Sequence, residues 1–215
     1  MGNLLNMSGG SLLEKGGLLP SGYTQLEYIE NTSNAYIDTG IVPNRDFGIE
    51  MDCYILTEIS TSAASAKLFG SSVFNNGFWG GIMMSTYPTK PGGQSTWCEA
   101  NVVGSFDPKL KGYERITLNC INNVYTAPDG TITYINYRND NLIYGTCYLF
   151  NIHTDRTLTT AGLRVYNTKI YEKINIVRNF IPCINPNNVV GMYDTVNGVF
   201  YSSPNGTAFV AGPEV

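Results

Sequence analysis

Short apolar runs separated by Asn-Gly or Asp-Gly pairs are the feature that most constrains the fold of this chain. Such pairs stand at Asn76-Gly77, Asp129-Gly130, Asn197-Gly198 and Asn205-Gly206. Asn and Gly tolerate the two positive φ angles that a type I′ turn needs, and such turns join neighbouring antiparallel strands. We therefore expect β-hairpins at these positions, with type I′ turns at the last two pairs.

Apolar and aromatic residues after residue 23 fall into runs of the length that β-strands have. One run alternates clearly, with Ile116, Leu118 and Cys120 on one face and polar residues between them. No window combines a long amphipathic period with helix-capping residues. The runs predict strands at 24–30, 35–40, 47–56, 66–72, 77–84, 114–121, 131–138, 146–152, 163–172, 176–183, 189–194 and 198–202.

About a dozen short strands in one domain are typical of β-sandwiches. We expect an all-β fold, a two-sheet antiparallel jelly-roll sandwich over residues 21–215. Charged residues make up 14% of the chain, against about 25% in typical soluble domains. The 23 Gly, 23 Asn and 15 Tyr residues suit turns and sheet surfaces better than exposed helices.

The net charge and the hydropathy pattern of the chain disfavour nucleic-acid binding and a membrane-spanning segment. A net charge of −4 offers no basic surface, so we expect no nucleic-acid partner. No apolar run approaches the roughly 20 residues that cross a bilayer, so we expect no membrane span.

Five cysteines, Cys53, Cys98, Cys120, Cys147 and Cys183, are far apart and include no Cys-x-x-Cys pair. They could form a disulfide or metal framework, or they could be small buried apolar side chains. The absence of metal-ligand spacing favours buried side chains, which also suits folding in a reducing cytosol.

Residues 1–20 differ from the rest of the chain. Leucine pairs, among them Leu4-Leu5 and Leu12-Leu13, alternate with glycine-rich breaks. A secretory signal would need a basic start and a continuous apolar core, and the glycines disfavour a self-supporting helix. A solvated tail is one interpretation, but the density of leucines favours an attachment arm that orders on a partner surface.

The longest turn-rich stretch, residues 85–107, carries two aromatic residues, Tyr87 and Trp97. Long loops in compact domains are often functional, and aromatic rings can stack on the flat faces of sugars. Together with Trp79 these residues are our candidates for ligand binding. Trp79 has a second interpretation, as a core side chain between the sheets.

Two carboxylates, Glu50 and Asp52, have the i, i+2 spacing that places both on one face of a strand. Glycosidases with sandwich folds use such pairs. Tyr54 stands where a further acid on that face would be expected. A solvated outer strand face is the simpler interpretation, and we expect no catalytic residues.

His153 is the only histidine, so a multi-histidine metal site is excluded, and no nucleophile motif accompanies it. We interpret His153 as a residue in a loop or at the end of a strand. Oxygen-rich segments around Asp129 and Asp140 lack the regular acidic spacing of a calcium loop. A bound calcium ion stays open without residues to assign to it, and we expect no cofactor and name no metal ligand.

The closing segment holds Tyr193, Asp194, Phe200 and Tyr201, which could form a polar and aromatic site. Because they stand between two tight turns, we interpret them instead as strand residues that close the sheets. In this interpretation Asp194 holds a turn.

Three segments of the sequence resemble one family. They are LPSGYTQLEYIE at 19–30 followed by AYIDTG at 35–40, KLFGS at 67–71, and the closing segment 177–215. In them the chain is similar to the laminin-G-like (concanavalin A-like) jelly-roll domains of structural proteins from bacteriophages and prophages. The resemblance implies two antiparallel sheets packed face to face, no shared catalytic residues, and a non-catalytic module that binds glycans. The calcium ligands of laminin-G domains and lectins have no counterparts here.

The resemblance and the arm together predict a non-enzymatic virion surface protein that is made in the host cytoplasm. It would be a head fibre, a capsid decoration or a tail receptor-binding module, and the short arm suits a small appendage. Residues 1–20 would attach to other virion proteins, and the sandwich would contact host or mucosal glycans. Fibre-like assembly predicts a homo-oligomer, with a trimer as the first candidate. The alternatives are a lectin-like carbohydrate-binding module of a bacterial cell surface and a glycosidase of the same fold that would depend on Glu50.

Overall fold

The computed structural model describes residues 18–31, 34–56, 67–75, 78–87, 94–95, 110, 112–134, 143–154 and 162–215. Among the described residues from 74 to 95, the side chains described are those of Ile82 and Met84, and the others are described by their backbone. The described residues form strands and turns and no helix. Their strands pair antiparallel in two sheets, so the expected all-β, two-sheet antiparallel sandwich is confirmed.

The larger sheet contains β1 (Thr24–Gln25), β2 (Ile29–Asn31), β4 (Phe47–Ile55), β8 (Arg115–Ile121), β9 (Val124–Thr126), β10 (Ile132–Tyr134), β12 (Leu163–Glu172), β13 (Asn175–Ile184), β14 (Val190–Asp194), β15 (Val199–Tyr201) and β16 (Val210–Ala211). The smaller sheet contains β3 (Ile37–Asp38), β5 (Lys67–Asn75), β6 (Phe78–Tyr87), β7 (Gln94–Ser95) and β11 (Tyr148–Leu149).

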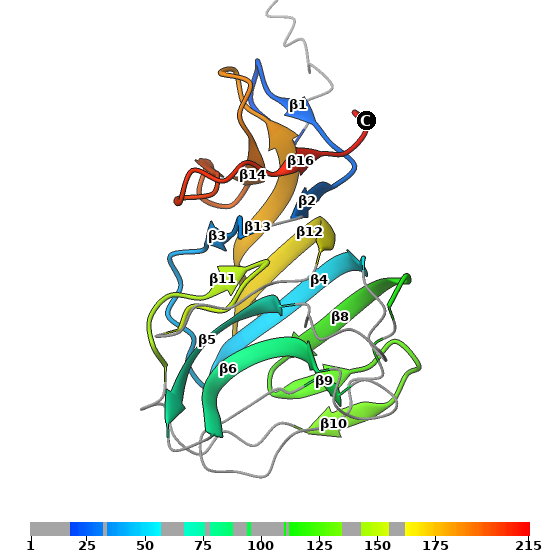
Figure 1. Cartoon of the computed structure of the whole chain (residues 1–215), viewed down its shortest axis with the longest axis vertical. Coiled ribbons are helices and arrows are strands. Elements are labelled where there is room, and N and C mark those ends of the chain that lie inside the picture. Colours follow the sequence, from blue (N-terminus) through cyan, green and yellow to red (C-terminus); the bar gives the residue numbers. More distant parts are fainter. Residues whose placement is uncertain are drawn as a thin grey trace, which may run out of the picture.

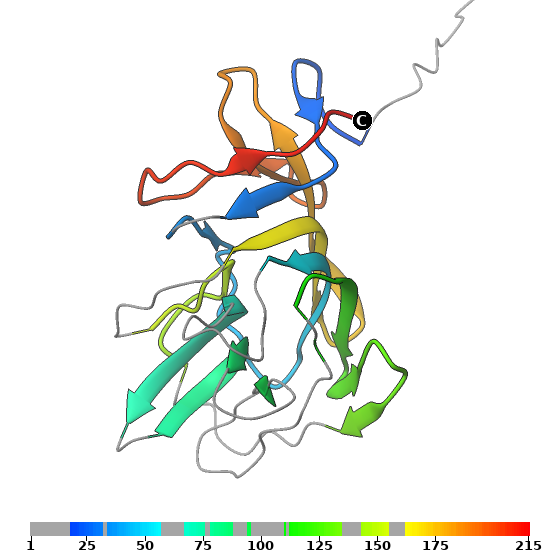
Figure 2. The same cartoon turned by 45° about the vertical axis from the view of Figure 1, so that its right-hand side comes forward.

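The smaller sheet covers one face of the larger sheet. The strand order is β10-β9-β8-β4-β12-β13-β14-β15 in the larger sheet and β3-β11-β5-β6-β7 in the smaller. Figures 1 and 2 show β5 and β6 lying over β4 and β8. The opposite face of β4, β8 and β12 therefore faces solvent.

The larger sheet divides at the start of β12. Residues 163–165 of β12 pair with β2, whereas residues 168–172 pair with β13. The far end of β13 pairs instead with β1 and β14, and β16 joins β2. As Figure 1 shows, both ends of the described chain meet here. This arrangement places β2, from an early part of the chain, beside β12.

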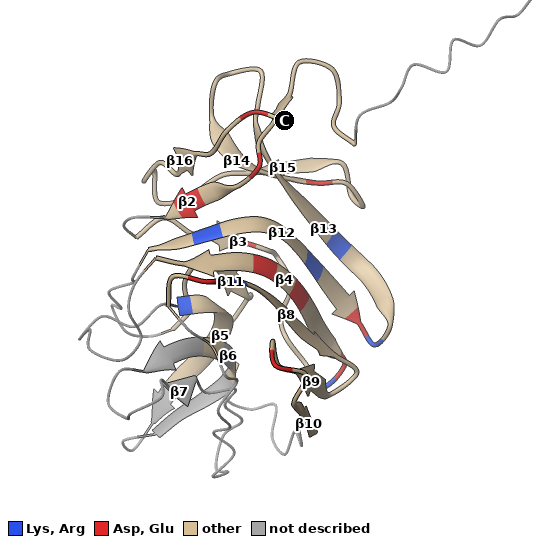
Figure 3. Cartoon of the chain, turned by 90° about the vertical axis from the view of Figure 1, so that its right-hand side faces the viewer, with Lys and Arg blue, Asp and Glu red and all other residues tan. Residues whose placement is uncertain are grey.

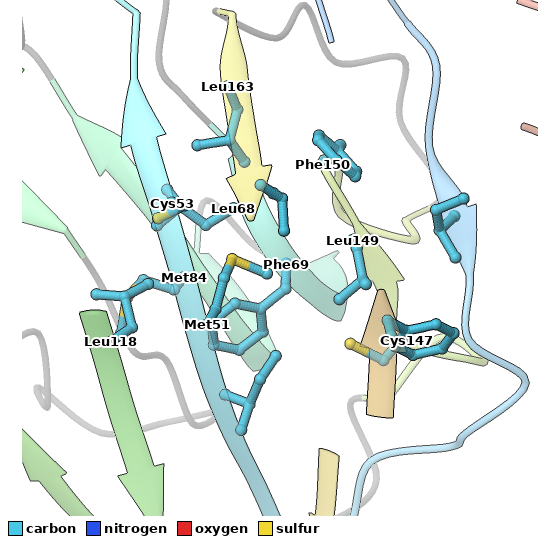
Figure 4. Close-up of a cluster of buried hydrophobic side chains, with 14 of the residues drawn as sticks. Met51, Cys53, Leu68, Phe69, Met84, Leu118, Cys147, Leu149, Phe150 and Leu163 are labelled. Carbon is cyan, nitrogen blue, oxygen red and sulfur yellow. The ribbon is translucent and has the colours of Figure 1, made fainter. Parts of the chain in front are cut away.

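The core lies between the sheets and is built from alternate residues of their strands. Met51 and Leu118 from the larger sheet face Phe69, Met84 and Leu149 from the smaller sheet, all at most 1% exposed. Figure 4 shows these side chains interleaved. Burying each such side chain contributes roughly 1.5–3 kcal/mol to folding, so this layer fixes which faces of β4, β8 and β12 point outward.

The predicted strands agree closely with the structure in the long elements. β12 occupies the predicted residues 163–172, and β4 ends one residue before the predicted end. β6 continues to Tyr87, into the stretch expected to be a loop, and pairs there with β7. The expectation that residues 85–87 belong to a loop is therefore wrong.

The Asn197-Gly198 hairpin is confirmed, because this pair connects the paired strands β14 and β15. Asn205-Gly206 stands between β15 and β16, which pair with β14 and β2 and not with each other, so the hairpin expected there is wrong. Asn76-Gly77 lies outside the described residues, between the paired strands β5 and β6.

The turn type also differs from the prediction. Gly198 and Gly206 have φ of +70° and +78°, whereas Asn197 and Asn205 do not have positive φ. The expected type I′ turns at these two pairs are therefore wrong. Pro204 explains the second case, because proline fixes a negative φ and favours a type I turn closed by the Gly206 N–H to Ser203 O hydrogen bond.

Asn122-Asn123 forms the type I′ turn that the structure does contain. These two residues have φ of +52° and +62° and connect β8 to β9, with Ile121 paired to Val124. Asparagine adopts positive φ more readily than most residues. The Asp129-Gly130 turn connects β9 to β10 as predicted.

The aromatic residues of the closing segment serve packing, as expected. Tyr193 packs edge-on against Tyr23, with ring centroids 5.2 Å apart, and Phe200 packs against the same tyrosine. Tyr201 packs against buried Phe180. Asp194 is fully buried and accepts hydrogen bonds that close the turn after it, which confirms its predicted role.

Four cysteines, Cys53, Cys120, Cys147 and Cys183, are buried and carry free thiols. Burial raises the pKa of each of these thiols, that of Cys183 to about 12. They behave as small apolar core residues, as predicted. Cys98 lies outside the described residues.

Candidate functional site

The solvent-facing side of the larger sheet carries a network of ion pairs and tyrosines. In β4, Glu50, Asp52 and Tyr54 are half-buried while the residues between them are fully buried. This alternation turns the three side chains away from the core. Figure 3 shows acidic and basic positions side by side on β2, β4 and β12.

A β-bulge in β12 arranges the outward side chains of that strand. Val165 pairs with Cys53 and Asn167 pairs with Asp52, so Tyr166 is an extra residue without a partner on β4. Buried positions change from 163 and 165 before the bulge to 168 and 170 after it. Bulges redirect side chains locally and are frequent beside functional sites. Here the bulge brings Tyr166 over the outer face, near Arg115.

Arg115, at the start of β8, is held on two sides. Its Nε and Nη2 donate hydrogen bonds of 3.0 and 2.8 Å to the two carboxylate oxygens of Asp52. Its guanidinium carbon lies 3.6 Å from the centre of the Tyr166 ring. Nη1 lies 3.8 Å from a carboxylate oxygen of Glu27. A bidentate ion pair and a stacked ring fix a guanidinium more firmly than either contact alone.

Arg164, in β12, is held in a similar way. Its Nε donates a 2.7 Å hydrogen bond to Glu30 on β2, which the division of the sheet places alongside. Its guanidinium carbon lies 4.7 Å from the centre of the Tyr28 ring and 5.6 Å from that of Tyr54. No hydrogen bond involves its two terminal nitrogens within the described part of the chain.

Tyr28 and Tyr166 join the two arginine clusters. Their rings pack edge to face, with centroids 5.3 Å apart. Burial raises the pKa of the Tyr166 phenol, and both Arg115 and Arg164 act against that rise. The hydroxyl stays protonated at neutral pH, so it can donate and accept hydrogen bonds. We call this surface the Arg–Tyr platform, formed by Glu27, Tyr28, Glu30, Asp52, Tyr54, Arg115, Arg164 and Tyr166.

Glu50 and Asp52 point outward together, as the i, i+2 spacing predicts, and each carboxylate is paired with a cation. Asp52 accepts the two hydrogen bonds from Arg115, and Glu50 accepts one of 2.7 Å from Lys169. Both carboxylates therefore lie on the outer face of the sheet within ion pairs.

A second aromatic group lies on the smaller sheet around His153. The rings of Tyr36, Tyr148 and His153 form a stack, with centroid separations of 4.2 and 4.1 Å, and Tyr144 packs edge-on against the histidine. Nδ1 of His153 lies 2.9 Å from the carbonyl oxygen of Thr146. His153 forms an isolated bridge with Ser71 rather than part of a strand, which agrees with the predicted strand-end position. The ring faces inside this stack are already occupied.

A surface pocket of about 210 Å³ lies at the opposite end of β12, beside the β12–β13 hairpin. Its lining is mainly apolar, from Ile41, Val42, Phe47, Tyr171 and Val177. Among the described residues it contains no cluster of titratable side chains, so its chemistry indicates no particular ligand.

The aromatic residues predicted to bind a ligand are not brought to a described site. Tyr87 and Trp79 stand on β6, but their side chains are outside the described set, as is all of Trp97. The arm residues Leu4, Leu5, Leu12 and Leu13 also lie outside it. These assignments stay predictions.

The sequence alone did not reveal the Arg–Tyr platform. Its members come from β2, β4, β8, β12 and the segment before β2, and the register of these strands brings them together. One local signal was available. Arg164 and Tyr166 flank an apolar residue at strand spacing, which indicates that both point away from the core.

The described residues include no group of three or more His, Cys, Asp or Glu side chains that could hold a metal ion. This part of the chain also contains no helix with the length and apolarity that crossing a membrane would need. The chain matches no protein-family model, and comparison with the curated proteins and with the solved structures finds no significant match.

Proposed function

We propose that this protein is a non-catalytic glycan-binding module on the surface of a bacteriophage particle. The sandwich presents the ligand-binding surface, and residues 1–20 attach the protein to other virion proteins. The Arg–Tyr platform is the observation that supports glycan binding best. It is a fixed surface that combines phenol hydroxyls, guanidinium groups and carboxylates, which can form hydrogen bonds with sugar hydroxyls.

The ion pairs of Glu50 and Asp52 support a non-catalytic role. In a glycosidase one carboxylic acid keeps its proton to protonate the leaving group. Here each carboxylate already holds a cation of the protein, Lys169 at 2.7 Å from Glu50 and Arg115 at 2.8 Å from Asp52. A substrate would have to displace these partners to use the carboxylates as a catalytic pair.

Binding without turnover is the test of this proposal. The full chain is applied to an array of bacterial and mucosal glycans, and the bound glycans are then incubated with the protein and assayed for new reducing ends. We expect specific retention and no release of reducing sugar. Release that disappears in Glu50→Gln would instead establish a glycosidase, and the absence of any glycan binding would contradict the proposed function.

The attachment role of residues 1–20 needs a separate test. Deleting them should abolish incorporation into particles while the far-ultraviolet circular dichroism spectrum of the sandwich stays unchanged. Incorporation of the deletion variant at the wild-type level would contradict the attachment role. Light scattering of the full chain checks the proposed homo-oligomer and its trimeric state.

A further inference from the structure

We infer that the Arg–Tyr platform selects neutral, polyhydroxylated glycans and holds one sugar unit at Tyr166, beside Arg115 and the Tyr28–Arg164 pair. This inference rests on the proposed function, since it specifies the class of glycan and the place where it binds. It follows from the balance of charge on the platform, from its free hydrogen-bonding groups and from the way its side chains are fixed.

The charge of the platform disfavours an anionic ligand. Two guanidinium groups, Arg115 and Arg164, stand against three carboxylates, Glu27, Glu30 and Asp52, which gives a formal charge of −1. The neighbouring pair of Lys169 and Glu50 adds no net charge. A uronate or sulfate group would meet cations that are already neutralised and acids that repel it.

The free hydrogen-bonding groups suit sugar hydroxyls. The terminal nitrogens of Arg164 and Nη1 of Arg115 make no hydrogen bond within the described residues, so they can donate. Glu30 uses one carboxylate oxygen for Arg164, and the other can accept. Sugar hydroxyls both donate and accept, and can therefore satisfy both kinds of group. A sulfate or carboxylate group only accepts.

The stacking geometry indicates contact through hydroxyl groups rather than through ring faces. Arg115 covers the face of Tyr166 at 3.6 Å, and Arg164 lies over Tyr28. These ring faces are thus partly occupied, which leaves polar groups such as the phenol oxygen of Tyr166 for a ligand. Since it can donate and accept, it complements the arginine donors of the platform.

The platform is fixed before a ligand arrives. Each arginine is anchored by a carboxylate on another strand and by an aromatic ring from another segment of the chain. Side chains that are already ordered lose little conformational entropy on binding, which favours affinity for a ligand with few strong contacts.

Affinity electrophoresis of the full chain tests the inference. Gels contain a neutral polysaccharide (mannan, galactan or β-glucan) or an anionic one (polygalacturonate or hyaluronate), each at low and high salt. We compare the wild type with Tyr166→Phe, Arg164→Lys and Arg115→Lys. Tyr171→Phe is the matched control, because it removes a phenol oxygen from the same face of the same strand, next to the surface pocket instead of the platform.

We expect retardation by at least one neutral polymer that changes little with salt, because no net charge is exchanged. Removing one hydrogen bond in Tyr166→Phe should weaken binding roughly 3- to 10-fold. Each Arg→Lys change should weaken it about tenfold, because lysine lacks the planar fork. Tyr171→Phe should bind like the wild type, and circular dichroism should show that all variants are folded.

The outcomes separate the inference from the proposed function. Retardation only by anionic polymers, lost at high salt, would overturn the neutral-glycan assignment and leave glycan binding intact. Binding of a neutral polymer that survives all three platform changes but is lost in Tyr87→Ala or Trp97→Ala would overturn the location. Retardation by none of the polymers would remove both the inference and the proposal on which it rests.

Discussion

Asp194 accepts a 3.0 Å hydrogen bond from the backbone N–H of Asn179, so a fully buried carboxylate joins β14 to the neighbouring strand β13. The same carboxylate also accepts hydrogen bonds from the Val196 N–H and the Asn197 side chain, and Nε of Arg178 lies 3.5 Å away. The Asp194 side chain therefore supports the turn after β14, the pairing of β13 with β14, and the compensation of the positive charge of Arg178.

Asp194→Asn should therefore destabilise the fold strongly. The amide replaces one acceptor oxygen with a donor that faces other donors, and it leaves Arg178 without its counter-charge. We expect a loss of roughly 2–4 kcal/mol in the free energy of unfolding, measured by urea denaturation. Asp46→Asn is the control. Its ion pair with Lys173 is exposed and spans 3.8 Å, so its loss should cost less than about 0.5 kcal/mol. Equal effects of the two changes would contradict the role given to Asp194.

Thr168→Val should stabilise the protein. Thr168 is fully buried in β12, and its hydroxyl has no hydrogen-bond partner among the described residues. Valine keeps the shape and removes the desolvated hydroxyl, which should add roughly 1 kcal/mol. Thr39→Val is the matched change. The Thr39 hydroxyl donates to Cys147 O at 2.7 Å, and its removal should cost roughly 1–2 kcal/mol. Thermal unfolding of both variants should shift in opposite directions.

Asn123→Gly should also stabilise the protein, whereas Asn197→Gly should not. Asn123 has a φ of +62° and a buried side-chain oxygen without a partner, so glycine relieves both costs and adds up to about 1 kcal/mol. Asn197 lacks positive φ, and its side chain donates to Asp194 and to Val177 O. Its replacement should cost about 1 kcal/mol. Denaturation midpoints measured side by side would show the opposite signs.

Buried thiols should make the fold less stable at alkaline pH. The pKa of Cys183 rises from its ordinary value of 9.0 to about 12 in the folded state. Between these values the unfolded chain loses the proton and the folded chain keeps it. Stability from this group is therefore complete below pH 9 and is lost as the pH rises toward 12, at about 1.4 kcal/mol per pH unit. Cys183→Ala removes this contribution, so the stability difference between wild type and variant under reducing conditions should shrink above pH 9. A difference that stays constant from pH 7 to 11 would contradict this account.

The platform ion pairs should contribute little to folding. The side chains of Arg115 and Asp52 are 50% and 28% exposed, and exposed pairs contribute about 0.2–1 kcal/mol. A double-mutant cycle with Arg115→Lys and Asp52→Asn should give a coupling energy in this range by urea denaturation. A coupling energy several times larger would mean that the pair is mainly structural, and effects on glycan binding would then need correction for stability.

The strands that could be predicted from the sequence are those whose own residues alternate between apolar and polar. β4 and β12 were predicted within one residue because apolar residues occupy most of their core-facing positions, with Thr168 as an exception in β12. β16 was missed because it has two residues and pairs with β2, with Val210 opposite Glu30, so that its only determinant is a partner far away in the chain. β9 was missed because the turn before it is Asn-Asn rather than Asn-Gly.

The outward orientation of Glu50 and Asp52 followed from their spacing, but their partners did not. Arg115 reaches Asp52 because of the register between β4 and β8, and Arg164 reaches Glu30 because the sheet divides. Both relationships are set by packing of distant segments. The bulge at Tyr166 leaves no mark in a hydrophobicity pattern, because Tyr and Asn are both compatible with either face.

The extra residue in β12 puts the two halves of that strand out of phase. Removing Tyr166 alone would leave Val165 opposite Cys53 and Asn167 opposite Asp52, a regular ladder in which the other side chains of β12 keep their faces. The bulge thus adds one side chain to the outer face, beside Arg115, without changing which residues of β12 face the core.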